Sequence, residues 1–248
     1  MNTGIHNFDI TKQINANVDQ AEVLHQMHRT QNLLARHQVT CKSFSEKALA
    51  KLLQETDREK LQRMAANFNP MNELLEEILA DGDSDLENKE VLILQKALSK
   101  FGLRLDENFW PMIEKGDVIE VYGPNMIQLH RSFNFYDKTS YSLLDIILNE
   151  WYILWERPER VLKEVVPMVD GILSGKRPTG KCLLRKHIVK EIYNTGATEP
   201  FEPRSLVLDF KYIGPLYKSV GHDIAGFVIT SDCKVGSIGD EVYELDLI

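Results

Sequence analysis

The stretch VIEVYGPNMIQLHRSFNFYDKTSYSLLDI, from Val118 to Ile146, decides how the rest of this chain is interpreted. It contains two runs rich in β-branched and aromatic residues, Val118–Tyr122 and Met126–Phe133, with a Gly-Pro-Asn turn between them. Residue types of this kind favour strands, and Gly-Pro pairs favour turns. The pattern predicts two consecutive strands, followed by short helices that begin near Tyr141.

The second of these runs alternates in the way expected for a half-buried strand. Leu129 and Arg131 share one face, while Gln128 and His130 share the other. Because successive side chains of a strand point to opposite sides, we expect the two pairs to lie on opposite faces of a sheet.

A long amphipathic segment and three further strand-like runs follow. Pro158–Leu173 carries apolar residues at helical spacing, and Pro167 within it predicts a kink. The runs His187–Tyr193, Ser205–Tyr217 and Asp223–Asp232 alternate like strands. The order is therefore two strands, a helical crossover and three strands.

In the run that begins at Ser205, four apolar residues recur at every second position, so they are predicted to share one face of the strand. They are Leu206, Leu208, Phe210 and Tyr212.

Over residues 117–235 this order resembles that of a PAS sensor domain. Phe133–Tyr136 followed by Ser140-Tyr141-Ser142 is similar to the PAS segment in which an Asn and an aromatic residue lead into a Gly-Tyr-Ser turn and a helix. Ser140 stands where that family usually has Gly. The resemblance implies a five-stranded antiparallel sheet with a helical crossover, a cavity for a small molecule, and a role in signal transduction.

The N-terminal part of the chain is predicted to be helical. Apolar residues at helical spacing indicate helices over Val18–Arg36, over the pair of segments in 45–68, over Met71–Leu79 after a break at Asn69-Pro70, and over Asn88–Phe101. The last of these is expected to bury Val91 and Leu92. The resemblance implies that this helix, which leads into the first strand, carries the signal or the dimer contact.

These elements divide the chain into four parts and give the fold class α+β. Residues 1–16 are expected to be a loose arm, and residues 17–116 a helical region with a dimerisation or output role. Residues 117–235 are the PAS-like sensor domain, and residues 236–248 are a C-terminal extension.

Composition limits the classes of protein that fit. The 248 residues carry a net charge of −8, which argues mildly against a basic nucleic-acid binder. The three cysteines, Cys41, Cys182 and Cys233, have no CxxC spacing and are expected to be reduced thiols. The N-terminus lacks a secretory pattern, and no apolar run is long enough to cross a bilayer. We expect a cytoplasmic protein with no membrane partner.

Nine side chains of the PAS-like stretch are candidates for binding a small molecule. Most are aromatic, and Tyr212 or His130 would supply a polar contact. Trp151 and Trp155 lie four residues apart and are expected to project from one side of a helical turn. Two interpretations stay open, since the rings either line a cavity or fill a plain core. The nine are Phe133, Phe135, Tyr141, Trp151, Trp155, Phe210, Tyr212, Phe227 and His130.

The sequence nominates no catalytic residue and no metal site. P-loop, GxSxG and HExxH patterns are absent. Asp81–Glu87 has the first three aspartates of an EF-hand loop but lacks its Gly and its bidentate Glu. No Cys lies between Cys41 and Cys182, so the reactive Cys of flavin-binding PAS relatives is missing. His130 and His187 are the histidines that a haem or metal would use, and any cofactor stays unknown.

The preferred function is that of a non-enzymatic PAS-like sensory or regulatory protein of a bacterial type. It would bind a small molecule or a partner protein and transmit the signal through its N-terminal helices and a homodimer interface.

A DNA-binding transcriptional regulator is the alternative, with a helix-turn-helix-like pair at 45–68. Residues 29–63 contain eight basic and four acidic residues, a local excess of four positive charges. An enzyme with an unrecognised site is a third class, which fold resemblance does not decide.

Overall fold

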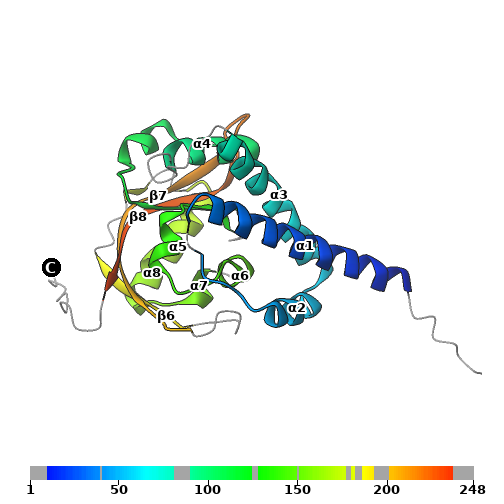
Figure 1. Ribbon diagram of the computed structural model, residues 1–248. Helices are drawn as coiled ribbons and strands as arrows, with labels where there is room; N and C mark the ends of the chain where they lie inside the picture. Colours follow the sequence, from blue (N-terminus) through cyan, green and yellow to red (C-terminus); the bar gives the residue numbers. More distant parts are fainter. Residues whose placement is uncertain are drawn as a thin grey trace, which may run out of the picture.

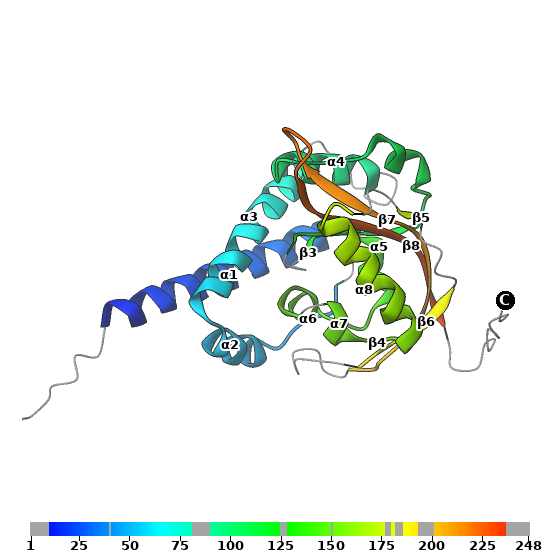
Figure 2. The ribbon, with the colours of Figure 1, turned by 180° about the vertical axis from the view of Figure 1, so that it is seen from behind.

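The structure is a computed structural model that describes residues 10–39, 41–80, 90–124, 128–149, 151–176, 180–181, 186–192 and 201–236. Figure 1 and Figure 2 show a curled sheet with helices on both of its sides. All strand pairs of the sheet are antiparallel. The combination of helices with an antiparallel sheet confirms the predicted mixed fold class. None of the described helices is both long and apolar enough to span a membrane.

The five predicted strands are all present, and they form the body of the sheet. They are β2 (Val118–Tyr122), β3 (Gln128–Arg131), β6 (His187–Glu191), β7 (Ser205–Lys218) and β8 (Ile224–Gly236). Their order across the sheet is β3-β2-β8-β7-β6, with β4 (Trp155–Glu156) beyond β6. Two more short strands, β1 (Leu103–Leu105) and β5 (Gly180–Lys181), pair with β7. These three short strands were not predicted, because two or three residues carry no readable alternation.

The central pair β7 and β8 runs from Ser205 opposite Gly236 to Tyr217 opposite Ile224. Its register shifts between Phe210 and Tyr212, where a β-bulge inserts one extra residue. Because of that bulge, Phe210 and Tyr212 belong to different hydrophobic clusters on the two faces of the sheet. The prediction that Leu206, Leu208, Phe210 and Tyr212 share one face is therefore wrong for Tyr212.

One face of the sheet is covered by α4 (Glu90–Lys100) and the 3-10 helix η2 (Glu107–Met112). Leu94 and Leu98 of α4 pack with Phe109 and sheet residues, while Ile93 and Ala97 belong to the other hydrophobic cluster. The predicted burial of Val91 and Leu92 is wrong, because they are 38% and 44% exposed. Because α4 lies between the two hydrophobic clusters, it buries the side chains on two adjacent faces. Val91 and Leu92 belong to neither of these faces.

The opposite, concave face is covered by the helical crossover. Its helices are α5 (Asn134–Lys138), α6 (Leu143–Leu148), α7 (Trp151–Leu154) and α8 (Glu159–Leu173). Along α8, Val161, Val165 and Val169 are buried at a spacing of four residues, and they face β7 and β8. The predicted helix Pro158–Leu173 is confirmed to within one residue, and Pro158 is its N-cap.

The N-terminal helices are α1 (Ile10–Arg36), α2 (Glu46–Glu55) and α3 (Arg58–Ala80). Two predictions about them are wrong. The first helix begins at Ile10 rather than Val18, so residues 10–16 of the expected arm are helical. The second correction concerns α3, which continues through Asn69-Pro70 instead of breaking there. Buried residues on both sides of the proline, such as Phe68 and Leu74, hold the two halves in one hydrophobic cluster, which outweighs the hydrogen bond that a proline removes.

A single hydrophobic cluster joins these helices to the concave face. It contains Val23 and Leu34 of α1 and Leu61 of α3 together with Phe133 and Trp155 of the predicted sensor domain. The core therefore crosses the predicted boundary between residues 116 and 117. Figure 1 and Figure 2 also show the first half of α1 extending away from the rest of the molecule.

Candidate functional site

The structure describes the side chains of eight of the nine predicted ligand-binding residues, and all eight are buried. They are Phe133, Phe135, Tyr141, Trp155, Phe210, Tyr212, Phe227 and His130. Trp151 belongs to α7, and its side chain lies outside the described residues. Trp155 belongs to the short strand β4 instead of a shared helical turn, so the expected pairing of the two tryptophans on one helix is wrong.

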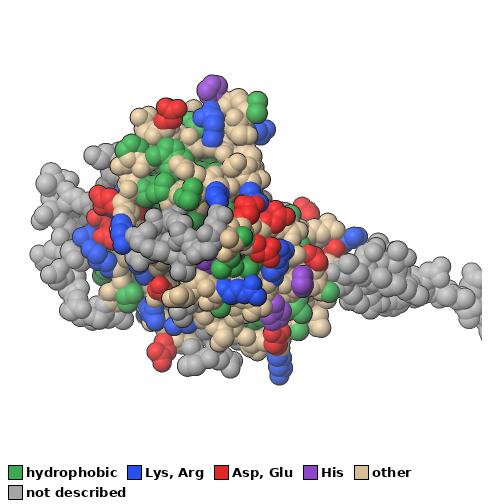
Figure 3. Space-filling model, turned by 45° about the horizontal axis from the view of Figure 1, so that its top comes forward, with side chains coloured by type: hydrophobic (Ala, Val, Ile, Leu, Met, Phe, Trp, Pro, Cys, Tyr) green, Lys and Arg blue, Asp and Glu red, His purple; other side chains and the backbone are tan. Residues whose placement is uncertain are grey.

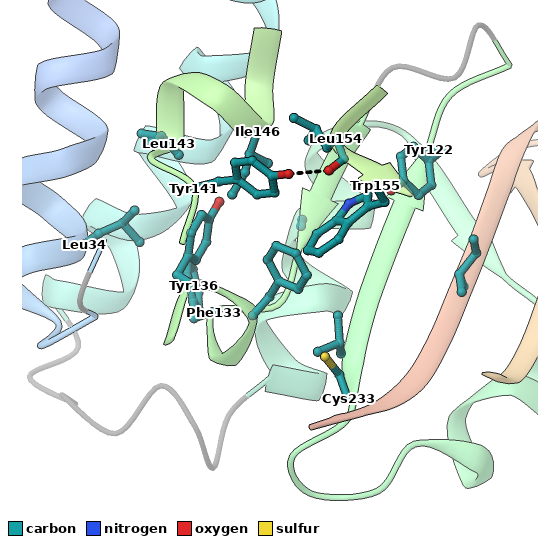
Figure 4. Close-up of a cluster of buried hydrophobic side chains, with 14 of the residues drawn as sticks. Leu34, Tyr122, Phe133, Tyr136, Tyr141, Leu143, Ile146, Leu154, Trp155 and Cys233 are labelled. Carbon is teal, nitrogen blue, oxygen red and sulfur yellow. Dashed lines mark hydrogen bonds between the residues drawn. The ribbon is translucent and has the colours of Figure 1, made fainter. Parts of the chain in front are cut away.

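Six of the eight come together in the cluster on the concave face. They are Phe133, Phe135, Tyr141, Trp155, Phe210 and Phe227. The ring of Trp155 meets the rings of Tyr141 and Phe135 edge-on, at centroid distances of 5.3 and 6.1 Å. Figure 4 shows Phe133, Tyr141 and Trp155 between the helix that carries Leu34 and the strand that carries Tyr122.

The hydroxyl of Tyr141 anchors this cluster to the backbone. It donates a hydrogen bond to the carbonyl oxygen of Leu154, and it accepts one from the backbone N–H of Ile192 at 3.2 Å. One buried phenol thus links the crossover to the end of β6. Figure 4 shows the first of these bonds as a dashed line.

Neither of the two residues expected to supply a polar contact belongs to this cluster, although the ring of His130 meets that of Phe133 edge-on at 6.4 Å. Tyr212 packs edge-on against Phe109, at 5.3 Å between ring centroids, in the cluster under α4. His130 lies directly opposite Val121, which belongs to that same cluster. Neither ring nitrogen of His130 has a hydrogen-bond partner among the described residues, and burial lowers its pKa to about 4. At neutral pH His130 is therefore an uncharged, buried side chain.

A buried polar group on the concave face was not predicted, and its centre is Arg131 of β3. Arg131 is 5% exposed as a whole residue, and its guanidinium donates through Nη2 to the carboxylate of Glu120 and, at 3.1 Å, to the hydroxyl of Tyr122. Tyr122 in turn donates to Glu120 at 2.7 Å. The guanidinium carbon lies 3.9 Å from the ring centroid of Phe135, within cation–π distance.

Gln128 completes this group. With its amide oxygen turned toward Arg131, it accepts hydrogen bonds from both Nε and Nη2 at 2.7 Å. Gln128 and Arg131 therefore share a face, which contradicts the alternation predicted for this strand. The register between β2 and β3 shifts at Val121 and Tyr122, and this irregularity brings residues three apart to the same side.

The electrostatics of the group are those of a charged cluster removed from water. Burial opposes the charged form of Arg131, but Glu120 and Tyr122 outweigh it, so its pKa is raised. Burial and the neighbouring Glu120 raise the pKa of the Tyr122 phenol. Burial also lowers the pKa of Arg157 to about 10, and the positive charge of Arg131 contributes to that shift. Arg131 and Arg157 therefore lie within electrostatic range of one another and of Glu120.

Arg131 retains one unused donor. Nη1 is buried and has no hydrogen-bond partner among the described residues. The arrangement is suited to holding an acceptor, since a guanidinium in a low-dielectric site binds anions more strongly than it does in water.

The two described thiols are poor nucleophiles. Burial raises the pKa of Cys41 and of Cys233 to about 12, so both are protonated at neutral pH. Within the described ranges no three His, Cys, Asp or Glu side chains gather as metal ligands do. Cys182 and the expected calcium-like loop Asp81–Glu87 lie outside the described residues.

A separate pocket of about 180 Å³ opens between α4 and the segment before β2. Acidic residues line part of it, including Glu90, Glu114 and Asp117. Asp117 accepts from Lys211 Nζ at 2.7 Å, and Glu90 accepts from the backbone N–H of Phe133 at 2.7 Å. These contacts give both carboxylates a structural role at the start of β2 and of α5.

The predicted helix-turn-helix-like pair corresponds to α2 and the first half of α3, separated by Thr56 and Asp57. Within the basic stretch of residues 29–63, Arg29 of α1 and Arg58 of α3 are paired with carboxylates. Arg29 binds Glu76 at 2.6 Å, and Arg58 binds Asp19 at 2.7 Å. On the face of the molecule that Figure 3 shows, acidic and basic side chains are interspersed in one part and hydrophobic side chains gather in another. The DNA-binding alternative stays a prediction.

Sequence reasoning missed Arg131, Glu120 and Tyr122 because charged residues are rarely buried, so the candidates were chosen among aromatic side chains. A signal was nevertheless present in the sequence, since Glu120 lies among four apolar or aromatic residues and Arg131 is followed closely by Phe133 and Phe135. No protein-family model matches the sequence, and a search of curated proteins finds no match to it.

Proposed function

We propose that this protein is a non-enzymatic, PAS-like sensory or regulatory protein. A small molecule would bind among the aromatic side chains on the concave face of the sheet, close to Arg131. Its arrival would change how that face packs against α1, α2 and α3, and those helices would pass the signal to a partner protein or to a second copy of the chain.

The observation that carries the proposal is the continuity of the hydrophobic cluster. Met27 and Leu34 of α1 and Leu49 of α2 are buried in the same cluster as Phe133, Tyr141 and Trp155. A closely packed core does not deform gradually, so a ligand that moves the rings has to move their helical neighbours as well.

Two further features support the proposal. The chain follows the order of two strands, a helical crossover and three strands, on which the resemblance to PAS domains was based. The first half of α1 extends away from the sheet, and we infer that a homodimer or a partner protein detects the change along this helix.

The test begins with native mass spectrometry of the freshly purified full chain, with an absorbance spectrum alongside. We expect a dimer, and extra mass from a retained small molecule. Incubation with a metabolite extract is expected to raise the melting temperature, since a ligand that binds only the folded state stabilises it by mass action.

Two variants on β7 give a matched comparison. Phe210 faces the concave cluster, whereas Tyr212 faces the cluster under α4. Phe210→Leu is expected to weaken the ligand-induced shift, and Tyr212→Phe is expected to leave it unchanged. A bare monomer whose melting temperature no extract alters would contradict the proposal.

A further inference from the structure

The strongest unexplained feature of the concave face is the donor that Arg131 leaves unused. Its side chain is 3% exposed, and Nη1 is buried without a hydrogen-bond partner among the described residues. A buried donor left unpaired costs folding free energy, and the cost is larger when the group is charged. A buried donor without a partner therefore calls for an explanation, and an acceptor that comes from outside the chain is one.

The surroundings of the guanidinium restrict where that acceptor lies. Glu120 and Tyr122 take Nη2, and the amide oxygen of Gln128 faces Nε and Nη2. One flat side of the guanidinium covers the ring of Phe135 at 3.9 Å. Nη1 is therefore the donor of this guanidinium that the described side chains leave without an acceptor, and the ring of Phe135 lies beside it.

The charges around Nη1 favour a single negative charge. Burial lowers the pKa of Arg157 to about 10, and the charges of Glu120 and Arg131 both act on it, so a second cation lies within electrostatic range of this group. A dianion such as phosphate fits less well, because the carboxylate of Glu120 is bonded to the same guanidinium and would repel it.

We propose that the ligand of this face is a small organic acid with an apolar or aromatic body, and that its carboxylate accepts a hydrogen bond from Nη1 of Arg131. The inference rests on the proposed function and adds the chemical class of the ligand. The aromatic body would pack against Phe135 and Trp155, whose rings already meet edge-on.

Pairs of acids and their amides test this directly, because each pair has the same shape and differs in charge. Benzoate with benzamide, phenylacetate with phenylacetamide, and acetate with acetamide are titrated at constant ionic strength into the full chain, by calorimetry and thermal shift. We expect at least one aromatic acid to bind at least about 10-fold more tightly than its amide, the usual advantage of a charge-assisted hydrogen bond.

Variants locate the interaction. Arg131→Gln is expected to abolish the preference for the acid. Because a buried arginine is hard to replace, Glu120→Gln serves as a second variant, which keeps the guanidinium and removes the competing negative charge. It is expected to tighten acid binding several-fold. The control is Arg104→Gln in β1, which removes a guanidinium that lies 4.9 Å from the ring centroid of Tyr217. It is expected to leave the affinities for the acids and the amides unchanged.

The outcomes separate this inference from the proposed function. If amides bind as tightly as acids, or if Glu120→Gln weakens acid binding, the ligand class is wrong while a small-molecule sensor remains supported. If no acid binds at millimolar concentration but native mass spectrometry finds a neutral compound retained, the inference again fails alone. If no compound of any kind binds, both fail.

Discussion

At the scale of single residues, the buried polar groups distinguish this core from a plain hydrophobic one. His130 and Arg131 are neighbours in sequence, yet one is neutral and the other charged in a buried setting. The difference follows from their partners, because Glu120 contacts Arg131 and no described group hydrogen-bonds to the ring of His130.

His130 leads to a prediction about pH. Its pKa is about 4 in the folded protein and 6.5 for an unperturbed histidine. As the pH falls, this side chain is therefore protonated at a higher pH in the unfolded chain than in the folded protein. The stability it contributes is present above pH ~6.5 and is lost as the pH falls toward 4. This loss is about 3 kcal/mol, at ~1.4 kcal/mol for each pKa unit.

Urea denaturation at several pH values measures this loss. His130→Leu is expected to flatten the part of the stability profile between pH ~6.5 and ~4, whereas replacement of the exposed His222 by Gln is expected to leave the profile as in the wild type. Parallel profiles for wild type and His130→Leu would show that His130 is solvated in the folded state.

Glu191 gives a second prediction at this scale. Its carboxylate is 1% exposed and accepts hydrogen bonds from Thr139 Oγ1, Ser140 N and Arg204 N, each at 2.8 Å. Glu191→Gln would point an NH₂ group at one of these donors, so we expect a loss of roughly 2–4 kcal/mol in the free energy of unfolding. Replacement of the exposed Glu202 by Gln is the matched control, and equal stabilities of the two variants would contradict this account of Glu191.

At the scale of elements, sequence patterns predicted which segments form strands better than which way their side chains face. All five long strands and α8 lie within a few residues of their predicted positions. The errors at Gln128 and Tyr212 both follow from shifts of register, at Val121/Tyr122 and at Phe210/Tyr212. One extra residue in a strand exchanges the faces to which all later side chains of that strand point. No local sequence pattern indicates where such a residue is inserted.

This limit also explains the outcome for the site. The six aromatic residues that gather on the concave face were found by their residue types and alternation. The Arg131 group was not found, since Glu120 and Arg131 meet only when β2 pairs with β3, and Gln128 joins them only because the register shifts beyond Val121. The continuity of α3 through Pro70 depends on packing with α1, and such packing is invisible to local propensity.

The close approach of β8 to β2 gives a prediction for a single glycine. A Cβ atom at Gly226 would lie 2.0 Å from the carbonyl oxygen of Tyr122, which is backbone and cannot move aside cheaply. Gly226→Ala is expected to cost at least about 2 kcal/mol in thermal or urea unfolding. Gly236→Ala is the control, because its Cβ would meet a flexible methyl group of Val207 at 3.1 Å, and a tolerated Gly226→Ala would show that the two strands lie farther apart.

At the scale of the whole molecule, one core holds the N-terminal helices and the concave face together. Residues of α1, α2, α3 and the crossover belong to the same cluster, while the other face of the sheet has its own under α4 and η2. This division predicts a direction for the signal, from the concave face to α1 and α2 more than to η2 on the far side.

The claim that the signal passes from the concave face to α1 and α2 is tested most directly by hydrogen–deuterium exchange of the full chain. Exchange is measured with and without a compound that the thermal-shift panel shows to bind. The account predicts changed protection in β2 and β3 together with α1 and α2, and little change in η2. Binding that alters protection only in the sheet and the crossover, with α1 and α2 exchanging as in the free protein, would contradict it.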